Sequence, residues 1–471
     1  MKTPQVTRPT DALRALPDVR GTPYRGIGNV SSTGAETRGY GYGAPSTDRR
    51  TRSPPPVRTS AEAPRERHMT DPSPPAAEPA HVIRDAAEAV ETAARLAAEF
   101  RVGASARDAG RELPYAQVER LSASGLLGVT VPAEHGGADV PVRTLAEVVR
   151  LLATGDPSLA QIPQSHFVYI NVLRRQGTPE QQKFFFGEVL AGKRFGNAQS
   201  EAGTRHVQDI RTRLTRDGDG PYVLDGLKHY STGALFAQWI PVLARVEDDS
   251  LHVAYVPRDA EGVTVVDDWN GMGQRTTASG TVRLEGVRVP ADRVVPHHLT
   301  FQGPQLHGAV AQLLHAAIDA GLASAALAEA AEFVRTKSRP WFESGLESAV
   351  EDPLLVQHFG ELGLRLRAAD ALLAAAGDAV DAATADLTDD TAAEASIAVA
   401  AAKVQAANTA VDVSGALFEL AGTRAADDSL NLHRFWRDAR THTLHDPVRW
   451  KLQHLGRYVL TGARPPRHGL L

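Results

Sequence analysis

The sequence contains no cysteine. This absence excludes disulfides, cysteine-ligated iron–sulfur clusters and cysteine nucleophiles, and it leaves the redox compartment open. Any redox chemistry of this chain therefore depends on an organic cofactor, or on a metal that is bound without thiolates.

Excess charge of one sign is also missing. The 471 residues carry a formal net charge of -5, so no strong field points to nucleic acid, a membrane surface or an acidic partner. We find no apolar run that approaches the length of a bilayer span, and the N-terminus lacks the apolar stretch of a signal peptide. The sequence therefore predicts a cytoplasmic protein without a nucleic-acid or membrane partner.

What the chain does contain changes along its length. Residues 1–80 are rich in Pro, Gly, Ser, Thr and Arg and show no apolar periodicity, which predicts a disordered tail. Met69 offers a second plausible start just before order begins. We expect residues 1–80 to be dispensable for folding.

Apolar periodicity divides the rest into three parts. Spacings of three and four residues predict an N-terminal helical domain over residues 81–193. Alternation with period two predicts an antiparallel, β-barrel-like domain over residues 194–298. Ala-rich helical patterns at about 301–338, 353–382 and 391–421, with a shorter one after Pro447, predict a C-terminal four-helix bundle within residues 299–471. The fold class is α+β, mainly α.

Three segments of the β region place small polar residues beside glycine. They read "FGNAQSEAG" at 195–203, "LKHYSTGALFAQW" at 227–239 and "WNGMGQRTTASGT" at 269–281. Such segments suit a backbone that approaches a flat ligand, but the same residues also satisfy ordinary turns. The candidate cofactor-binding residues are Asn197, Ser200, Ser231, Thr232 and Trp269.

Two histidines stand in the segment "RFWRDARTHTLHDPVRWK" at 434–451. His442 and His445 are three residues apart, so on a helical turn both imidazoles face one side. A metal site is one interpretation, although no acidic third ligand stands at a matching position. General acid/base chemistry is the other, because the ordinary pKa of histidine lies near neutrality. His166 lies alone in a helical stretch, where a packed core role is the simpler explanation.

The order of these segments resembles the acyl-CoA dehydrogenase superfamily over nearly all of residues 85–460. The motifs "QSEAG", "DGLKHYSTG", "LEGVRVP" and "RDAR" carry this resemblance. Four further motifs are most similar to the dibenzothiophene monooxygenase and sulfur-acquisition branch: "HYSTGALFAQW", "GMGQRTTASGT", "VRTKSRPW" and "ARTHTLHDP".

Departures from the dehydrogenase pattern favour that branch. Dehydrogenases place a catalytic Glu-Gly-Thr after the "RDA" segment, whereas this chain reads Asp446-Pro447-Val448. Their Arg-x-x-Phe-Gly motif, which helps to hold the adenine half of FAD, reads Arg339-Pro340-Trp341-Phe342 here. The resemblance therefore favours FMN over FAD, and we expect no acyl-CoA dehydrogenase activity.

The resemblance implies an FMN-dependent monooxygenase that oxidises an organosulfur compound of the sulfide, sulfoxide or sulfone type. Reduced FMN would come from a separate NADH-dependent reductase, since the chain has no nicotinamide-binding Gly-x-Gly-x-x-Gly motif after a strand. Molecular oxygen would add at the flavin C4a as a hydroperoxide, from which the sulfur takes one oxygen atom. A homotetramer or dimer is also implied.

The resemblance also assigns roles to single residues. Asn197 and Ser231 would bond the flavin, with Ser200 and Thr232 beside them, Trp269 would wall the pocket, and Arg339 would meet the phosphate. His166 and His445 would form the acid/base pair, with His442 in support and no metal involved.

Three alternatives stay open. One is an acyl-CoA or nitroalkane-type flavin oxidase that uses Asp446 as its base. Another is an enzyme that hydroxylates nitrogen on a sugar or aromatic substrate. The last is a non-catalytic scaffold that keeps the fold without a cofactor. The sequence does not choose among sulfur compounds, because pocket size depends on side-chain packing.

Overall fold

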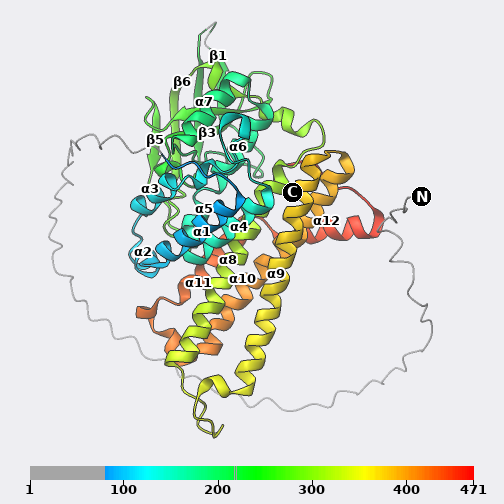
Figure 1. The fold of residues 1–471 in the computed structure, drawn as a ribbon. Coiled ribbons are helices and arrows are strands. Elements are labelled where there is room, and N and C mark those ends of the chain that lie inside the picture. Colours follow the sequence, from blue (N-terminus) through cyan, green and yellow to red (C-terminus); the bar gives the residue numbers. More distant parts are fainter. Residues whose placement is uncertain (1–79, 217, 219) are drawn as a thin grey trace, which may run out of the picture. The chain divides into compact units, whose positions relative to one another are not determined.

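A computed structural model describes residues 80–216, 218 and 220–471 (Figure 1). The tail predicted for residues 1–80 lies, apart from residue 80, outside the described residues, so it stays a prediction.

The first part of the described chain is helical, as predicted. Asp85 caps the first helix by accepting a hydrogen bond from the Glu88 backbone N–H, and Thr178 and Gln181 form a capping box on the last one. The helices are α1 (Ala86–Arg101), α2 (Ala104–Gly110), α3 (Tyr115–Ala123), α4 (Val142–Gly155), α5 (Pro157–Gln161), α6 (Gln164–Gln176) and α7 (Pro179–Leu190).

The middle part is one seven-stranded sheet in the order β5-β6-β2-β1-β3-β4-β7. The strands are β1 (Arg213–Arg216), β2 (Tyr222–Lys228), β3 (Trp239–Arg245), β4 (Leu251–Pro257), β5 (Val263–Val266), β6 (Thr281–Val289) and β7 (Val294–Val295). The sheet is mixed, because β1 runs parallel to β3 while every other pair is antiparallel, as predicted. The parallel pair arises because β1 lies between β2 and β3 in the sheet, so the connection from β2 to β3 passes over β1.

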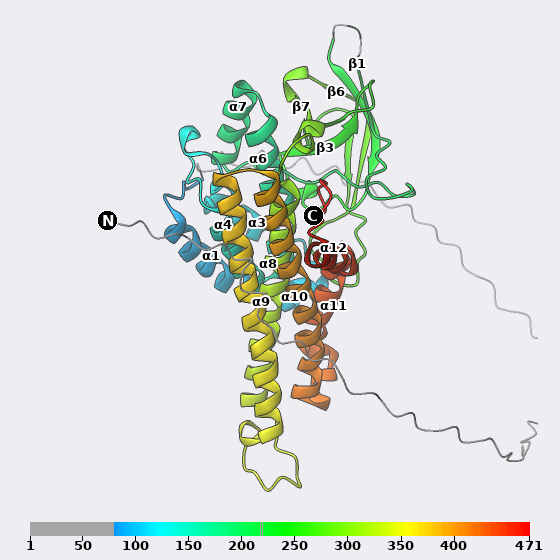
Figure 2. The ribbon, with the colours of Figure 1, turned by 90° about the vertical axis from the view of Figure 1, so that its right-hand side faces the viewer.

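In the last part, three long helices run alongside one another, and the final helix lies across them (Figure 1 and Figure 2). The expected helices are confirmed, with a short additional helix before the last one. They are α8 (His307–Lys337), α9 (Pro353–Ala385), α10 (Asp389–Ala421), α11 (His433–Thr443) and α12 (Val448–Thr461).

Helix α8 corrects one expectation from the sequence. Among the described helices it is the one long and apolar enough to cross a membrane, yet 83% of its apolar window is buried inside the protein. Its apolar surface therefore belongs to the core, where helices pack on it from several sides, and this explains why its pattern is apolar all round.

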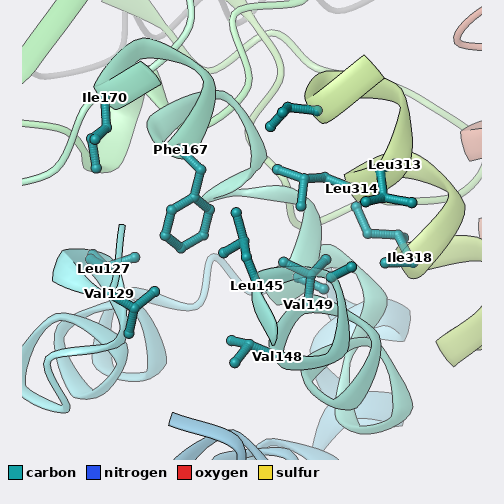
Figure 3. Packing of buried hydrophobic residues seen from close by; sticks show 14 of the residues in the cluster. Leu127, Val129, Leu145, Val148, Val149, Phe167, Ile170, Leu313, Leu314 and Ile318 are labelled. Carbon is teal, nitrogen blue, oxygen red and sulfur yellow. The ribbon is translucent and has the colours of Figure 1, made fainter. Parts of the chain in front are cut away.

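Two faces of α8 make different contacts, one apolar and one polar. Figure 3 shows Leu313, Leu314 and Ile318 of α8 beside side chains of α4 and α6 in the main core. His315 and Asp319, one turn apart, project from a different face and contact α10 and α11. The core face thus fixes the position of a polar face.

Helices α1, α4 and α8 cross at glycines. A Cβ atom on Gly155 would lie 2.2 Å from the carbonyl oxygen of Ala97, and one on Gly321 would lie 2.2 Å from that of Arg150. Both distances are far below contact, so these crossings require glycine.

Candidate functional site

The turn between β2 and β3 is bound to the 269–281 segment. Ser231 donates its backbone N–H to the Gly280 carbonyl at 3.0 Å, and Gly233 donates to Thr277 at 3.4 Å. Gly233 has φ 75°, and a Cβ atom there would lie 3.1 Å from the Ile162 carbonyl oxygen at the end of α5. The turn therefore packs directly on the junction of α5 and α6.

The hydroxyl of Ser231 is the outstanding feature of this turn. It is buried, and it has no hydrogen-bond partner among the residues that the structure describes. A buried hydroxyl is normally satisfied, so this one is free to bond a polar ligand atom. Thr232 differs, because its hydroxyl lies 2.7 Å from that of Ser279.

Asn197 and Ser200 lie on the neighbouring 195–203 segment. The Asn197 side chain donates to the Tyr230 carbonyl at 3.3 Å and accepts from the Tyr169 hydroxyl at 3.4 Å. These are long bonds that a ligand can replace. Ser200 is half-buried, and its carbonyl accepts from the His229 backbone N–H.

A buried ion pair fixes this segment on the sheet. Lys228, which is fully buried, donates to Glu201 at 2.7 Å and to the Gln199 and Leu243 carbonyls. Glu201 in turn accepts from the Thr212 backbone and hydroxyl. Burial lowers the pKa of Lys228 to about 8, against the pull of Glu201.

Trp269 and Tyr230 form an aromatic pair beside the turn. Their ring centroids are 6.2 Å apart at 73°, and Trp269 donates its indole N–H to the Gln274 carbonyl at 2.8 Å. Tyr230 adopts φ 56°, a backbone conformation uncommon for a residue with a side chain. The pair can wall a flat ligand at Ser231.

Helices α6, α8 and α11 meet the same region. The Gln164 side chain donates to the Ala311 carbonyl of α8 at 3.2 Å. The Gln274 backbone N–H donates to the Asp438 carboxylate of α11 at 2.5 Å. Polar groups predicted from three separate β segments are therefore linked to the helices that carry the histidines.

His442 is buried and doubly bonded. Its Nδ1 lies 2.5 Å from Asp319 of α8, and its Nε2 lies 3.0 Å from Nδ1 of His315. Asp319 also accepts from Lys403 of α10 at 2.8 Å. With both ring nitrogens engaged, His442 is not free to ligate a metal, and within residues 80–216, 218 and 220–471 no group of three or more His, Cys, Asp or Glu side chains could hold one.

His445 is the more accessible histidine. Its side chain is 44% exposed, and its ring lies against the His315 ring with centroids 4.1 Å apart. Its Nδ1 is 3.6 Å from the Asp446 carboxylate. Asp446 itself is buried and bound to Lys451 at 2.7 Å. Burial alone raises the pKa of Asp446, but His445 and Lys451 lower it well below its ordinary value, so this carboxylate is a weak base.

His166 lies deep in the core. Its Nδ1 accepts from the Phe195 backbone N–H at 3.0 Å, and its Nε2 lies 3.0 Å from the Leu127 carbonyl. Burial lowers its pKa to about 4. No ring nitrogen is left for a reacting group, so the predicted acid/base role of His166 finds no support in this geometry.

Arg339 is separated from the other candidates within one chain. It is exposed and follows the C-terminal end of α8, whereas His315 lies near the start of that helix. From His315 to Lys337 the axis runs about 33 Å, at roughly 1.5 Å per residue. Arg339 is therefore separated from the histidine cluster at the start of α8.

Sequence reasoning missed His315, Asp319 and Lys403. A signal was present, because each is an isolated polar residue in an Ala-rich run, "LLHAAIDAGLA" for the first two and "AAAKVQAAN" for the third. A charge in an otherwise buried helix is expensive unless it is paired, so such residues point to a buried network.

Comparisons with known proteins agree with this layout. Family models described as the N-terminal, middle and C-terminal domains of acyl-CoA dehydrogenase match residues 84–193, 196–287 and 313–450. A dibenzothiophene monooxygenase from Rhodococcus erythropolis is 35% identical over 400 residues, which are 81% of this chain and 96% of that protein.

Two further relatives cover similar lengths. A probable FMNH2-dependent monooxygenase, SfnC, from Pseudomonas putida is 32% identical over 80% of this chain and 96% of its own. The crystal structure of FMN-bound TdsC from Paenibacillus sp. A11-2 superposes with a TM-score of 0.78 at 31% identity, covering 81% of this chain and 100% of that one. With all three domain models and full-length relatives in agreement, the chain belongs to the acyl-CoA dehydrogenase family, on its dibenzothiophene monooxygenase branch.

Proposed function

We propose that this protein is a flavin-dependent monooxygenase that uses reduced FMN and O2 to oxygenate a small organosulfur compound. The observation that carries the proposal is the state of Asp446, which stands where dehydrogenases keep their base. It is buried, bound to Lys451 and followed by Pro447, while the partly exposed His445 lies beside it. The carboxylate at the position of the dehydrogenase base is thus a weak base, and the imidazole of His445 beside it can act as a general acid or base instead.

The free buried hydroxyl of Ser231 supports flavin binding at this site, because it can bond a polar atom of the cofactor. Ser231 and Asn197 would bond the polar edge of FMN, Ser200 and Thr232 would line its surroundings, and Trp269 would cover it. When bound, reduced FMN supplies the activation of O2. The chain's own residues hold the cofactor, exclude water and move protons, since water entry wastes the reduced flavin.

His445 is assigned the proton-moving role at this site. It is accessible on one side and held by His315 and Asp446 on the other. Its imidazole can donate a hydrogen bond to developing negative charge and can act as a general acid or base. His166 is assigned a packing role instead, because both its nitrogens are bonded.

Arg339 is assigned to the cofactor phosphate of a second copy. Its separation from His315 along α8 supports a phosphate contact made across the interface of a homodimer or homotetramer. An exposed arginine followed by the exposed aromatics Trp341 and Phe342 suits such an interface. A separate NADH-dependent FMN reductase and a cytoplasmic location complete the proposal.

Product analysis tests the function. The protein would be supplied with FMN, a flavin reductase, NADH and a panel of sulfides, sulfoxides, sulfones and acyl-CoAs. We expect an oxygenated sulfur product that requires both FMN and O2, and no acyl-CoA turnover with an artificial electron acceptor. Acyl-CoA turnover at about one per second or faster, the ordinary range for enzymes, would instead establish the oxidase alternative with Asp446 as base.

A further inference from the structure

A line of four buried side chains lies behind His445. Lys403 of α10 donates to Asp319 of α8 at 2.8 Å, and the other Asp319 oxygen lies 2.5 Å from His442 of α11. The line ends at His315 of α8, 3.0 Å from His442. All four side chains are at most a few per cent exposed. None of them is among the residues proposed to bind the flavin, so the line requires its own explanation.

The hydrogen bonds fix where the protons are. Burial raises the pKa of Asp319, but Lys403 and His442 lower it below its ordinary value, so it is a carboxylate and only accepts. His442 must then carry its proton on Nδ1. When His442 is neutral, its Nε2 accepts from Nδ1–H of His315. His315 Nε2 is left bare, and no hydrogen bond joins it to another residue in the described ranges 80–216, 218 and 220–471.

When a proton binds His315 Nε2, the hydrogen bond to His442 defines the next transfer. The N–H bond on His315 Nδ1 breaks as one forms on His442 Nε2, and the positive charge comes to rest on His442 beside the Asp319 carboxylate. The line gains one proton and one unit of charge. The reverse sequence returns the proton to the site.

The neighbouring charges favour this distribution. Burial lowers the pKa of His315 well below its ordinary value, and positive charge on the neighbouring His445, His442, Lys403 and Lys451 lowers it further. Burial also lowers the pKa of His442, but Asp319 opposes that effect. Asp446, paired with Lys451, adds a fixed anion on the far side of His445. Charge is therefore better placed on His442 than on His315.

We propose that His315, His442 and Asp319 form a buried proton relay whose open end accepts a proton at the His445 site. Asp319 is the positioning residue that makes the relay basic, and its ion-pair partner Lys403 keeps Asp319 ionised. This proposal rests on the proposed function for the reaction that it serves. His315 has no hydrogen bond to His445, so the two imidazoles act on the site in parallel.

The decisive variant is the double substitution Asp319→Asn with Lys403→Met. Asparagine keeps the hydrogen bond to His442 but removes the charge, and methionine avoids leaving a buried unpaired ammonium. Because the relay works as a base, wild-type turnover should fall as the pH drops through its pKa. In the double variant this low-pH fall in turnover, the acid limb of the pH profile, should shift to lower pH by about one unit or more. The value of kcat should be about 10-fold lower, whereas KM and FMN affinity should stay nearly unchanged.

A matched control keeps the result specific. Arg107→Met with Asp156→Asn dissolves another buried ion pair, one of 3.0 Å between α2 and the start of α5. It should lower the melting temperature by a comparable amount and leave the acid limb in place. The relay would be overturned if the pH of the acid limb is unchanged in the Asp319 and Lys403 double variant, or if it shifts equally in the control.

A second measurement does not need the loaded enzyme. Solid-state NMR of the full chain, labelled with ¹⁵N in the histidine rings and free of flavin, reports the protonation of each nitrogen. Lowering the pH should protonate His442 and His315 as a coupled pair. In the double variant this protonation should occur at lower pH. The His315→Gln variant identifies the signals. Independent titration of the two rings would refute the relay even if organosulfur oxidation is found. Coupled titration without any sulfur product would leave the relay standing and refute the proposed function.

Discussion

At the scale of single residues, the free hydroxyl of Ser231 makes a direct prediction. Ser231→Ala should weaken FMN binding about 5- to 10-fold, the loss of one hydrogen bond of roughly 1 to 1.5 kcal/mol. Its melting temperature should hardly change, because no described residue bonds that hydroxyl. Fluorescence titration with FMN measures the effect. Ser414→Ala is the control, since that buried hydroxyl bonds only carbonyls of its own helix, at 2.6 and 3.2 Å, and its loss should leave FMN affinity intact.

His445 makes the second prediction at this scale. His445→Ala should lower oxygenated product by about 10² or more, the usual effect of losing an acid/base group. Hydrogen peroxide released per NADH consumed should rise, while folding and FMN affinity stay near those of the wild type. His358→Ala, on the distant part of α9, serves as control. A fully coupled His445→Ala enzyme with normal turnover contradicts the catalytic assignment, and a joint loss of stability and flavin affinity assigns His445 a structural role.

The sequence was informative about residues whose role depends on short motifs, and less so about the rest. Asn197, Ser231 and Trp269 stand in segments with several glycines and hydroxyls, which made them visible. His315, Asp319 and Lys403 form a network only because α8, α10 and α11 bring them together. The resemblance paired His166 with His445, whereas its place in a helical stretch favoured packing, and its two backbone bonds support the packing role.

At the scale of elements, the Lys228–Glu201 pair holds the 195–203 segment against the sheet. Lys228→Met should destabilise the fold by about 3 to 5 kcal/mol, because it leaves a carboxylate buried without its cation. Chemical denaturation gives the value. Adding Glu201→Gln to this variant should recover much of the loss, since no buried charge then remains. If the single and double variants are equally unstable, packing rather than charge anchors the segment.

Periodicity predicted the helices well, but it did not predict how a helix that is buried on nearly all sides is oriented. The caps at Asp85 and Thr178 follow from local sequence. Helix α8 is apolar and buried over most of its surface, so its periodicity alone does not say which face meets α4 and which meets α11. The parallel β1–β3 pair likewise depends on a crossing that no short segment encodes.

At the scale of the whole molecule, buried neutral histidines predict sensitivity to acid. Burial lowers the pKa of His166 to about 4, of His297 to about 3 and of His307 to about 4. The unfolded chain, with ordinary values near 6.5, binds more protons between these limits. The free energy of unfolding should therefore fall as the pH drops from about 6.5 towards 4, by up to about 3 kcal/mol for each histidine.

Urea denaturation between pH 7 and pH 5 measures this dependence. His166→Gln removes one of the three histidines and should make the dependence shallower by up to about 1.4 kcal/mol per pH unit, which corresponds to one proton. The exposed-loop variant His206→Gln should leave it unchanged. A slope that is the same in all three proteins contradicts the assignment of acid sensitivity to buried histidines.

The glycine crossings of α1, α4 and α8 limit how this protein can be changed. No side chain fits at Gly155 or Gly321, so the three helices cannot be respaced by substitution. The same backbone carries His315 and Asp319 on α8. Mutant libraries that seek a new substrate should therefore keep these helices fixed and vary the loops around Tyr230 and Trp269, where exposed or half-exposed side chains allow change without moving the proton-handling groups.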